Sequence, residues 1–277
     1  MTTRRRKSTR KNLLPVDRVF RTVDDVIRGL SELEAIFATR HDKRGIFVSA
    51  YIPITREIAR RIGANEFEDS EWVARYLLAF ANLYREALAA DVHRQFDLVP
   101  RPWRIAFDEA QHGQALVLQH LILGISAHIN RDLPLALYEV TIDPDREMRQ
   151  RDHTAVNDAL WIATNQVQQR LAKLYSPFLG VLDLLGGPFD ELFTNFSFDV
   201  ARQAAWEAGV ELTDAAGSED RALVERQIEA RTAALAEVIL EPNRLFAPLW
   251  QVMKIMESAR GDWLAALPSQ VLAGVAL

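Results

Sequence analysis

The sequence predicts an all-α protein, and three observations support this fold class. Among 277 residues there are only 12 glycines and 11 prolines, whereas Ala, Leu, Glu, Arg and Gln, which lose little freedom in a helix, are abundant. Apolar residues also recur at three- and four-residue steps along much of the chain. We expect one single-domain bundle over residues 16–277, with about nine to ten helices around a central apolar helix at 105–130.

The first expected helix covers residues 23–40, which begin with "VDDVIRGL". Its apolar residues form one face of a helix. They are Val23, Val26, Ile27, Leu30, Leu33 and Phe37.

Residues 44–55 form the one segment that favours a strand, because they are rich in β-branched and aromatic side chains. Pro53 argues against a central strand, since proline has no N–H to donate to a neighbouring strand. Thr55 then fits the N-cap of a helix that ends near Gly63.

The clearest amphipathic helix is expected at residues 69–96, with Asp69 or Ser70 as its N-cap. The next segment, residues 101–130, is nearly apolar all round beyond Gly113. A helix that is apolar on every side is typically enclosed by other helices, so this one is expected at the centre.

Four further helices are expected in the second half of the chain. One covers residues 151–176 and ends before a proline, and a firm break follows at residues 186–188, "GGP". The others are expected at 197–209, 218–240 and 245–258.

Composition excludes several classes of protein. The chain has no cysteine, which removes disulfides, thiol nucleophiles and cysteine-ligated metals. No apolar stretch has the length of a signal peptide or of a membrane span, so we expect a cytoplasmic location. Residues 1–15 carry six basic residues and no acidic one, although the net charge of the chain is −5. We interpret them as a disordered basic tail, and the acidic remainder argues against nucleic-acid binding.

Familiar catalytic motifs are absent from the sequence. It contains neither a P-loop nor a G-x-G-x-x-G pattern, no nucleophile elbow and no His-Glu-x-x-His motif. A di-iron bundle needs two Glu-x-x-His pairs, and only Glu109 with His112 fits.

One polar cluster ends the central apolar segment, where residues 127–134 read "AHINRDLP". His128 falls on the same helical face as Leu121 and Gly124, so its ring should be buried. A buried imidazole needs partners for both nitrogens, and Asp132 lies one helical turn away.

This cluster has two interpretations. Asp132 precedes "LP", so it fits a helix N-cap, with His128 closing a corner between two helices. Alternatively, Asp132 orients His128 as a general base or metal ligand. Gly124 would leave space beside the imidazole, either for a small molecule or for a neighbouring helix.

A second polar pair, His153 and Asn157, lies beside Trp161 on the next helix. If this helix packs antiparallel to the central one, the pair converges with His128 and Asp132 at one end of the bundle. In the alternative, His153 follows a cap at Asp152 and is solvated.

These residues resemble a bacterial family of uncharacterised all-helical proteins. The resemblance covers about residues 20–260 and rests on the segments 69–88, 103–107, 124–137 and 156–157, with AHIN-x-DLP as the most specific part. It implies an all-helical fold and no particular function.

The His-x-x-x-Asp-Leu pattern at 128–133 is also similar to the zinc-binding helix of zinc-dependent phospholipase C and its single-strand nuclease relatives. That motif continues to a histidine where this chain has Tyr138, and its second His-x-x-x-Asp pair ends here in Asn157. A trinuclear zinc site is therefore not implied. The ligands left for one zinc or another divalent ion are His128, Asp132 and His153.

Two functions remain open. In the first, a hydrolase-like enzyme acts on a small or lipid-like molecule in an apolar pocket, with His128 and Asp132 as catalytic residues. Asn130, Asn157 and Trp161 would then contact the substrate. In the second, a non-catalytic ligand-binding or protein-interaction module uses the same cluster to hold its helices together. The apolar C-terminus "VLAGVAL" suits a homodimer, and in the alternative it packs on its own bundle.

Overall fold

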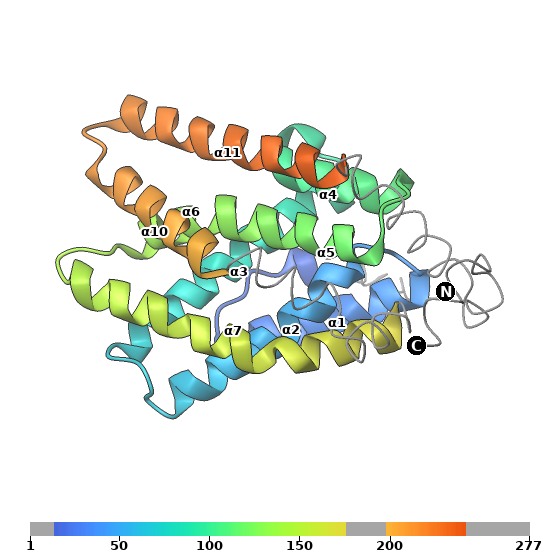
Figure 1. The fold of residues 1–277 in the computed structure, drawn as a ribbon, viewed down its shortest axis with the longest axis horizontal. Helices are drawn as coiled ribbons and strands as arrows, with labels where there is room; N and C mark the ends of the chain where they lie inside the picture. The colour runs from blue at the N-terminus through green and yellow to red at the C-terminus, as the bar shows by residue number, and fades with distance from the viewer. Residues whose placement is uncertain (1–13, 176–197, 242–277) are drawn as a thin grey trace, which may run out of the picture.

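The computed structural model describes residues 14–175 and 198–241, and the regular structure in these residues is entirely helical (Figure 1). The predicted all-α class is confirmed. The helices are α1 (Val23–Arg40), α2 (Gly45–Gly63), α3 (Ser70–Val92), α4 (Arg101–His112), α5 (Val117–Ser126), α6 (Leu133–Val140), α7 (Arg146–Leu174), α10 (Phe198–Asp214) and α11 (Ser218–Leu240).

The central apolar helix exists, but its limits differ from the prediction. α5 and α6 are joined by a π-helical segment, Ala127–Asp132, so that the chain is helical from Val117 to Val140. Counted as one, this central helix brings the number of helices in the described residues to eight, slightly below the nine to ten expected.

The expected helix at 105–130 is interrupted at residues 113–116, which separate α4 from α5. The carboxylate of Glu109, near the end of α4, accepts the N–H of Ala115 in this interruption at 2.8 Å. A Cβ at Gly113 would lie 1.8 Å from that carboxylate, so a larger residue there would displace the Glu109 side chain from this contact. Gln119 then caps α5 by accepting the N–H of Leu116 at 3.0 Å.

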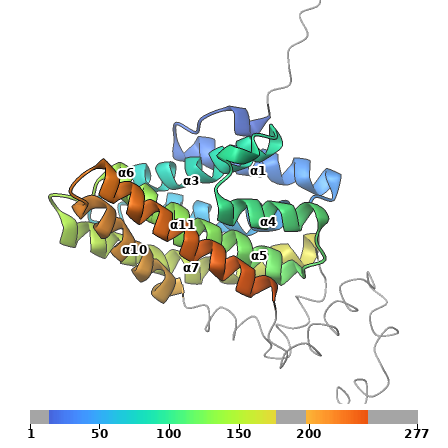
Figure 2. The same ribbon diagram turned by 90° about the horizontal axis from the view of Figure 1, so that it is seen from above.

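The central helix is enclosed on its sides by other helices. α6 packs against α3 and α10, whereas α5 packs against α2, α4 and α11. Figure 2 shows α10 and α11 on one side, and α1 lies beyond α2 and α3 on the other. This enclosure explains why the sequence of the central helix is apolar all round.

The prediction that residues 44–55 favour a strand is wrong, because they lie in α2. Nearly every residue there is buried, and a fully buried helix shows no polar face that distinguishes it from a strand. Thr55 is not an N-cap, since its hydroxyl donates to the carbonyl of Tyr51 at 2.8 Å within the helix.

Two other predicted helix starts agree with the structure, whereas predicted helix ends differ. Asp69 caps α3 by accepting the N–H of Trp72 at 2.8 Å, and α11 begins at Ser218 as expected. α10 continues past Gly209 to Asp214, because this glycine serves packing and does not end the helix. A Cβ at Gly209 would meet the side chain of Leu137 at 3.0 Å.

Several predictions concern residues outside the described ranges. These are most of the basic tail, the break at 186–188, the helix at 245–258 and the apolar C-terminus on which the homodimer rests. Among the described helices, none is long and apolar enough to cross a membrane.

Candidate functional site

The π-helical segment places the histidine and the aspartate of the AHIN-x-DLP motif at the centre of the bundle. Pro134 has no N–H, and in a regular α-helix its ring would clash with the carbonyl of Asn130. Here the turn is widened, and the N–H of Leu133 donates to the carbonyl of His128 five residues earlier. Such π-segments occur frequently at functional sites.

The interpretation of Asp132 as an N-cap is wrong. Its backbone is helical, with φ −78° and ψ −32°, and its side chain makes no capping hydrogen bond. The helix continues through this residue, so no corner between two helices exists for His128 to close.

Instead, the carboxylate of Asp132 is fully buried and accepts hydrogen bonds from three side chains. Oδ2 accepts from Nε1 of Trp103 at 2.8 Å and lies 2.9 Å from Nδ1 of His128. Oδ1 accepts from the guanidinium of Arg131 at 2.7 Å. These contacts fix the carboxylate, and through it the orientation of the imidazole.

The ring of His128 is 3% exposed and is surrounded by aromatic side chains. It stacks on Phe80 with 3.4 Å between ring centroids, and it meets the ring of Tyr51 edge-on at 4.8 Å. Burial lowers the pKa of His128, and the hydrogen bond to Asp132 opposes this only in part.

The imidazole is therefore neutral at pH 7, with its proton on Nδ1, where it is donated to Asp132. Nε2 then carries a lone pair. This nitrogen is buried and has no hydrogen-bond partner among the described residues.

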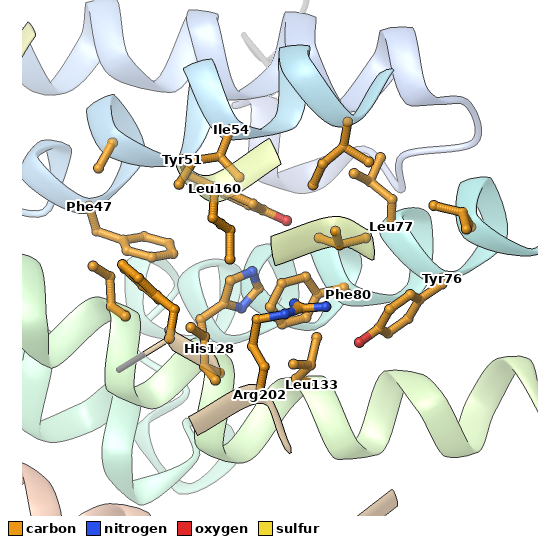
Figure 3. Close-up of a pocket in the computed structure, with 17 residues that line it drawn as sticks. Phe47, Tyr51, Ile54, Tyr76, Leu77, Phe80, His128, Leu133, Leu160 and Arg202 are labelled. Atoms are coloured by element: carbon orange, nitrogen blue, oxygen red, sulfur yellow. The ribbon is translucent and has the colours of Figure 1, made fainter. Parts of the chain in front are cut away.

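His128 lines a cavity of about 70 Å³ between α2, α3, the central helix, α7 and α10. A cavity needs about 10–15 Å³ to hold one water-sized group, so this space is large enough for a small ligand. The walls are mainly aliphatic and aromatic, and the polar side chains among them belong to Tyr51, Tyr76, His128 and Arg202. Figure 3 shows the imidazole and the guanidinium extending into the space between the apolar side chains.

The space expected beside Gly124 is filled by a neighbouring helix. A Cβ at this glycine would lie 2.7 Å from the ring of Phe47, which comes from α2. Gly124 therefore makes room for a neighbouring helix and not for a small molecule.

His153 of the second polar pair is buried, so the alternative of a solvated His153 is wrong. Nδ1 of His153 lies 2.9 Å from the hydroxyl of Tyr76, and Nε2 lies 3.0 Å from the carbonyl of Arg202. The ring is neutral because burial, together with the nearby guanidinium, lowers its pKa well below the usual value. Nε2 therefore donates to the carbonyl and Nδ1 accepts from the tyrosine.

The three predicted metal ligands do not come together. In residues 14–175 and 198–241, no group of three His, Asp or Glu side chains could hold a metal ion. Both ring nitrogens of His153 have partners on α3 and α10, and both oxygens of Asp132 accept hydrogen bonds. The set His128, Asp132 and His153 is therefore not a metal centre in this structure.

Arg202 contacts the second polar pair and lines the same cavity as His128, and the sequence pattern did not predict this role. It is 4% exposed, and it donates from Nε to Oδ1 of Asn157 at 2.5 Å and from Nη2 to the carbonyl of His153 at 2.6 Å. A signal was present in the sequence, because Arg202 lies four residues from both Phe198 and Trp206 on the apolar face of α10.

The predicted substrate contacts lie outside the cavity. Asn130 donates to the hydroxyl of Ser126 at 3.1 Å and does not line the cavity. Asn157 and the half-exposed Trp161 line a surface groove between α7 and α10, and Arg202 lines both this groove and the cavity.

Comparison with known protein families identifies the family of this chain. A family model described as "Family of unknown function (DUF5995)" matches residues 23–242. The comparisons with curated proteins and with solved structures gave no match.

Proposed function

This chain belongs to DUF5995, a family of unknown function, so we propose its function from the site alone. It is an enzyme that binds a small, largely apolar molecule in the central cavity and uses His128 as a general base. The observation that carries this proposal is the buried Nε2 of His128, which has no partner among the described residues although its ring lines the cavity.

The unpartnered Nε2 of His128 favours a ligand that carries a hydrogen-bond donor. A buried polar atom without a hydrogen bond costs about 1–3 kcal/mol. A ligand that donates to Nε2 removes this cost, and the apolar walls bind the rest of the molecule.

The pairing with Asp132 supports proton transfer. Before the reaction, the low pKa keeps Nε2 free to accept a proton at pH 7. When a proton arrives, the carboxylate 2.9 Å from Nδ1 stabilises the imidazolium that forms. The same pairing holds the ring in one tautomer and one orientation.

The size of the cavity restricts the ligand. An apolar cavity of about 150 Å³ holds a benzene molecule. At about 70 Å³, the cavity is roughly half as large, which favours a molecule of a few carbon atoms over a lipid.

A second candidate is a non-catalytic ligand-binding protein. It is favoured by the hydrogen bond from Trp103 to Asp132, which ties α4 to the central helix and gives the cluster a structural role. The two candidates differ in turnover, because a binding protein returns its ligand unchanged.

The experiment uses butan-2-one, a small ketone that exchanges its α-protons for deuterium in D₂O when a base abstracts them. We expect the protein to accelerate this exchange, followed by proton NMR, and His128→Gln to slow it at least tenfold. The matched control is His112→Gln, because His112 is exposed at the end of α4. Exchange at the same rate in the wild type and in His128→Gln would overturn the proposal, provided that circular dichroism shows both folded.

A further inference from the structure

We propose that the ligand of the central cavity is a small carboxylate anion, and that Arg202 binds its carboxylate. This inference rests on the proposed function, because it names the chemical class of the molecule on which His128 acts.

Arg202 is a buried cation whose described partners are all neutral. Its guanidinium donates to the side-chain oxygen of Asn157 and to the carbonyl of His153, and the hydroxyl of Tyr76 lies close enough to affect it. Among the described residues, no carboxylate forms an ion pair with it. Asp199, on the same helix, is exposed and acts on it only through a weak electrostatic attraction.

A buried charge without a counter-ion is unfavourable, and burial accordingly lowers the pKa of Arg202. An anion that enters the site supplies the missing counter-ion. The described hydrogen bonds use Nε and Nη2, which leaves donors on a group that has five N–H bonds in total. A carboxylate matches the planar fork of a guanidinium, because it accepts two parallel N–H bonds, and a small carboxylate can also carry the apolar group that the cavity walls favour.

The position of Arg202 gives the anion a route. Its side chain lines the cavity together with His128, and it also lines the surface groove between α7 and α10. In Figure 3 the guanidinium extends into the cavity between His128 and Tyr76. A carboxylate therefore meets Arg202 at the boundary between groove and cavity, while the short apolar part of the ligand fills the cavity.

The two polar groups also fix the orientation of the ligand. Nε2 of His128 is a hydrogen-bond acceptor, so it repels the carboxylate and attracts a hydrogen atom of the ligand. Arg202 has only donors, so it takes the carboxylate. The reactive hydrogen of the ligand is thereby directed towards the base.

The test compares butyrate with butyramide, which has the same shape and no charge, by isothermal titration calorimetry at pH 7. We expect the dissociation constant of butyrate to be at least tenfold lower. This comparison uses the wild-type chain, so it does not depend on the folding of a variant. In Arg202→Met the preference should disappear, whereas it should persist in Arg104→Met, since Arg104 lies exposed on α4.

The outcomes separate this inference from the proposed function. If the protein accelerates the exchange of butan-2-one but binds butyrate and butyramide with equal affinity, the proposal of a carboxylate ligand fails. The proposal that His128 is a general base is then still supported. If the protein prefers butyrate but does not accelerate the exchange, the result supports carboxylate binding by Arg202 and contradicts the role of His128 as a general base. Failure of both ligands to bind would overturn the carboxylate, and with no exchange the proposed function would fail as well.

Discussion

Oδ2 of Asp132 lies 2.9 Å from Nδ1 of His128 and 2.8 Å from the indole nitrogen of Trp103, so one buried oxygen accepts from both rings. This contact orients an imidazole that lines the cavity and leaves its other nitrogen without a partner among the described residues. The site thus combines an acceptor that is held in place with a small apolar space, and each prediction below tests one part of that arrangement.

Asp132→Asn should destabilise the protein by about 1–3 kcal/mol, because an amide has one acceptor oxygen where the carboxylate has two. Its NH₂ group would face a donor, either Arg131 or the two rings. Urea unfolding measures the loss. Asp97→Asn, at an exposed carboxylate on the surface, serves as the control and should change the free energy of unfolding by less than about 0.5 kcal/mol.

Gly124→Ala should cost about 1–3 kcal/mol, because the new methyl group would lie 2.7 Å from the ring of Phe47. Displacement of this ring also disturbs the neighbouring imidazole, with which it makes an edge contact. Gly63→Ala is the matched control, since a Cβ at Gly63 meets nothing within 4 Å. Equal thermal stability of the two variants would contradict the packing described for Phe47.

Ala50→Leu should fill the cavity and abolish the exchange of butan-2-one, because Ala50 lines this space. The free energy of unfolding should remain within about 1 kcal/mol of the wild type, since the added carbons have room. The same change at Ala81, which is fully buried away from the cavity, should cost about 1–3 kcal/mol. If Ala50→Leu destabilises the protein as much as Ala81→Leu does, this result contradicts the presence of an empty cavity beside Ala50.

Acidification from pH 7 to pH 5 should destabilise the protein through its buried histidines. Burial lowers the pKa of His128 and His153, and it lowers the pKa of His120 to about 4, with Lys43 adding to the effect. The unfolded imidazole titrates near about 6.5, so below that pH the unfolded state binds protons that the native state does not. Stability is therefore complete above about pH 6.5 and falls as the pH drops towards the native pKa.

Each such histidine contributes up to about 1.4 kcal/mol per pH unit, which urea midpoints at several pH values can measure. His120→Leu should reduce the slope, whereas His112→Gln, at an exposed ring, should leave it unchanged. A free energy of unfolding that is constant between pH 7 and pH 5 would show that these rings are protonated in the native state.

The sequence predicted those helices that have one polar face and a capping residue. α1 and α3 show a regular apolar stripe, and their starts agree with the structure, as does the start of α11 at Ser218. α2 was missed because its residues are buried on nearly every side, and Pro53 obscured its helical character. Periodicity carries no information where no face is polar.

The site was predictable only where it depends on one helix. His128 and Asp132 are four residues apart, so their contact followed from helical spacing. The π-segment was not predictable in this way, because the spacing pattern of the sequence gives no sign of the widened turn before Pro134. The hydrogen bonds that Arg202 donates to His153 and Asn157 on α7 were not predicted, because Arg202 lies on α10, at least 45 residues further along the chain.

The central claim is that Nε2 of His128 is an unprotonated acceptor that faces the cavity, and imidazole ¹⁵N NMR tests it most directly. We expect the His128 ring, assigned by its loss in His128→Gln, to show a protonated Nδ1 and an unprotonated Nε2 at pH 7. Butyrate should shift the Nε2 resonance and leave that of the exposed His112 unchanged. A ring protonated on Nε2 at pH 7, or a His128 resonance that butyrate does not move, would contradict the account.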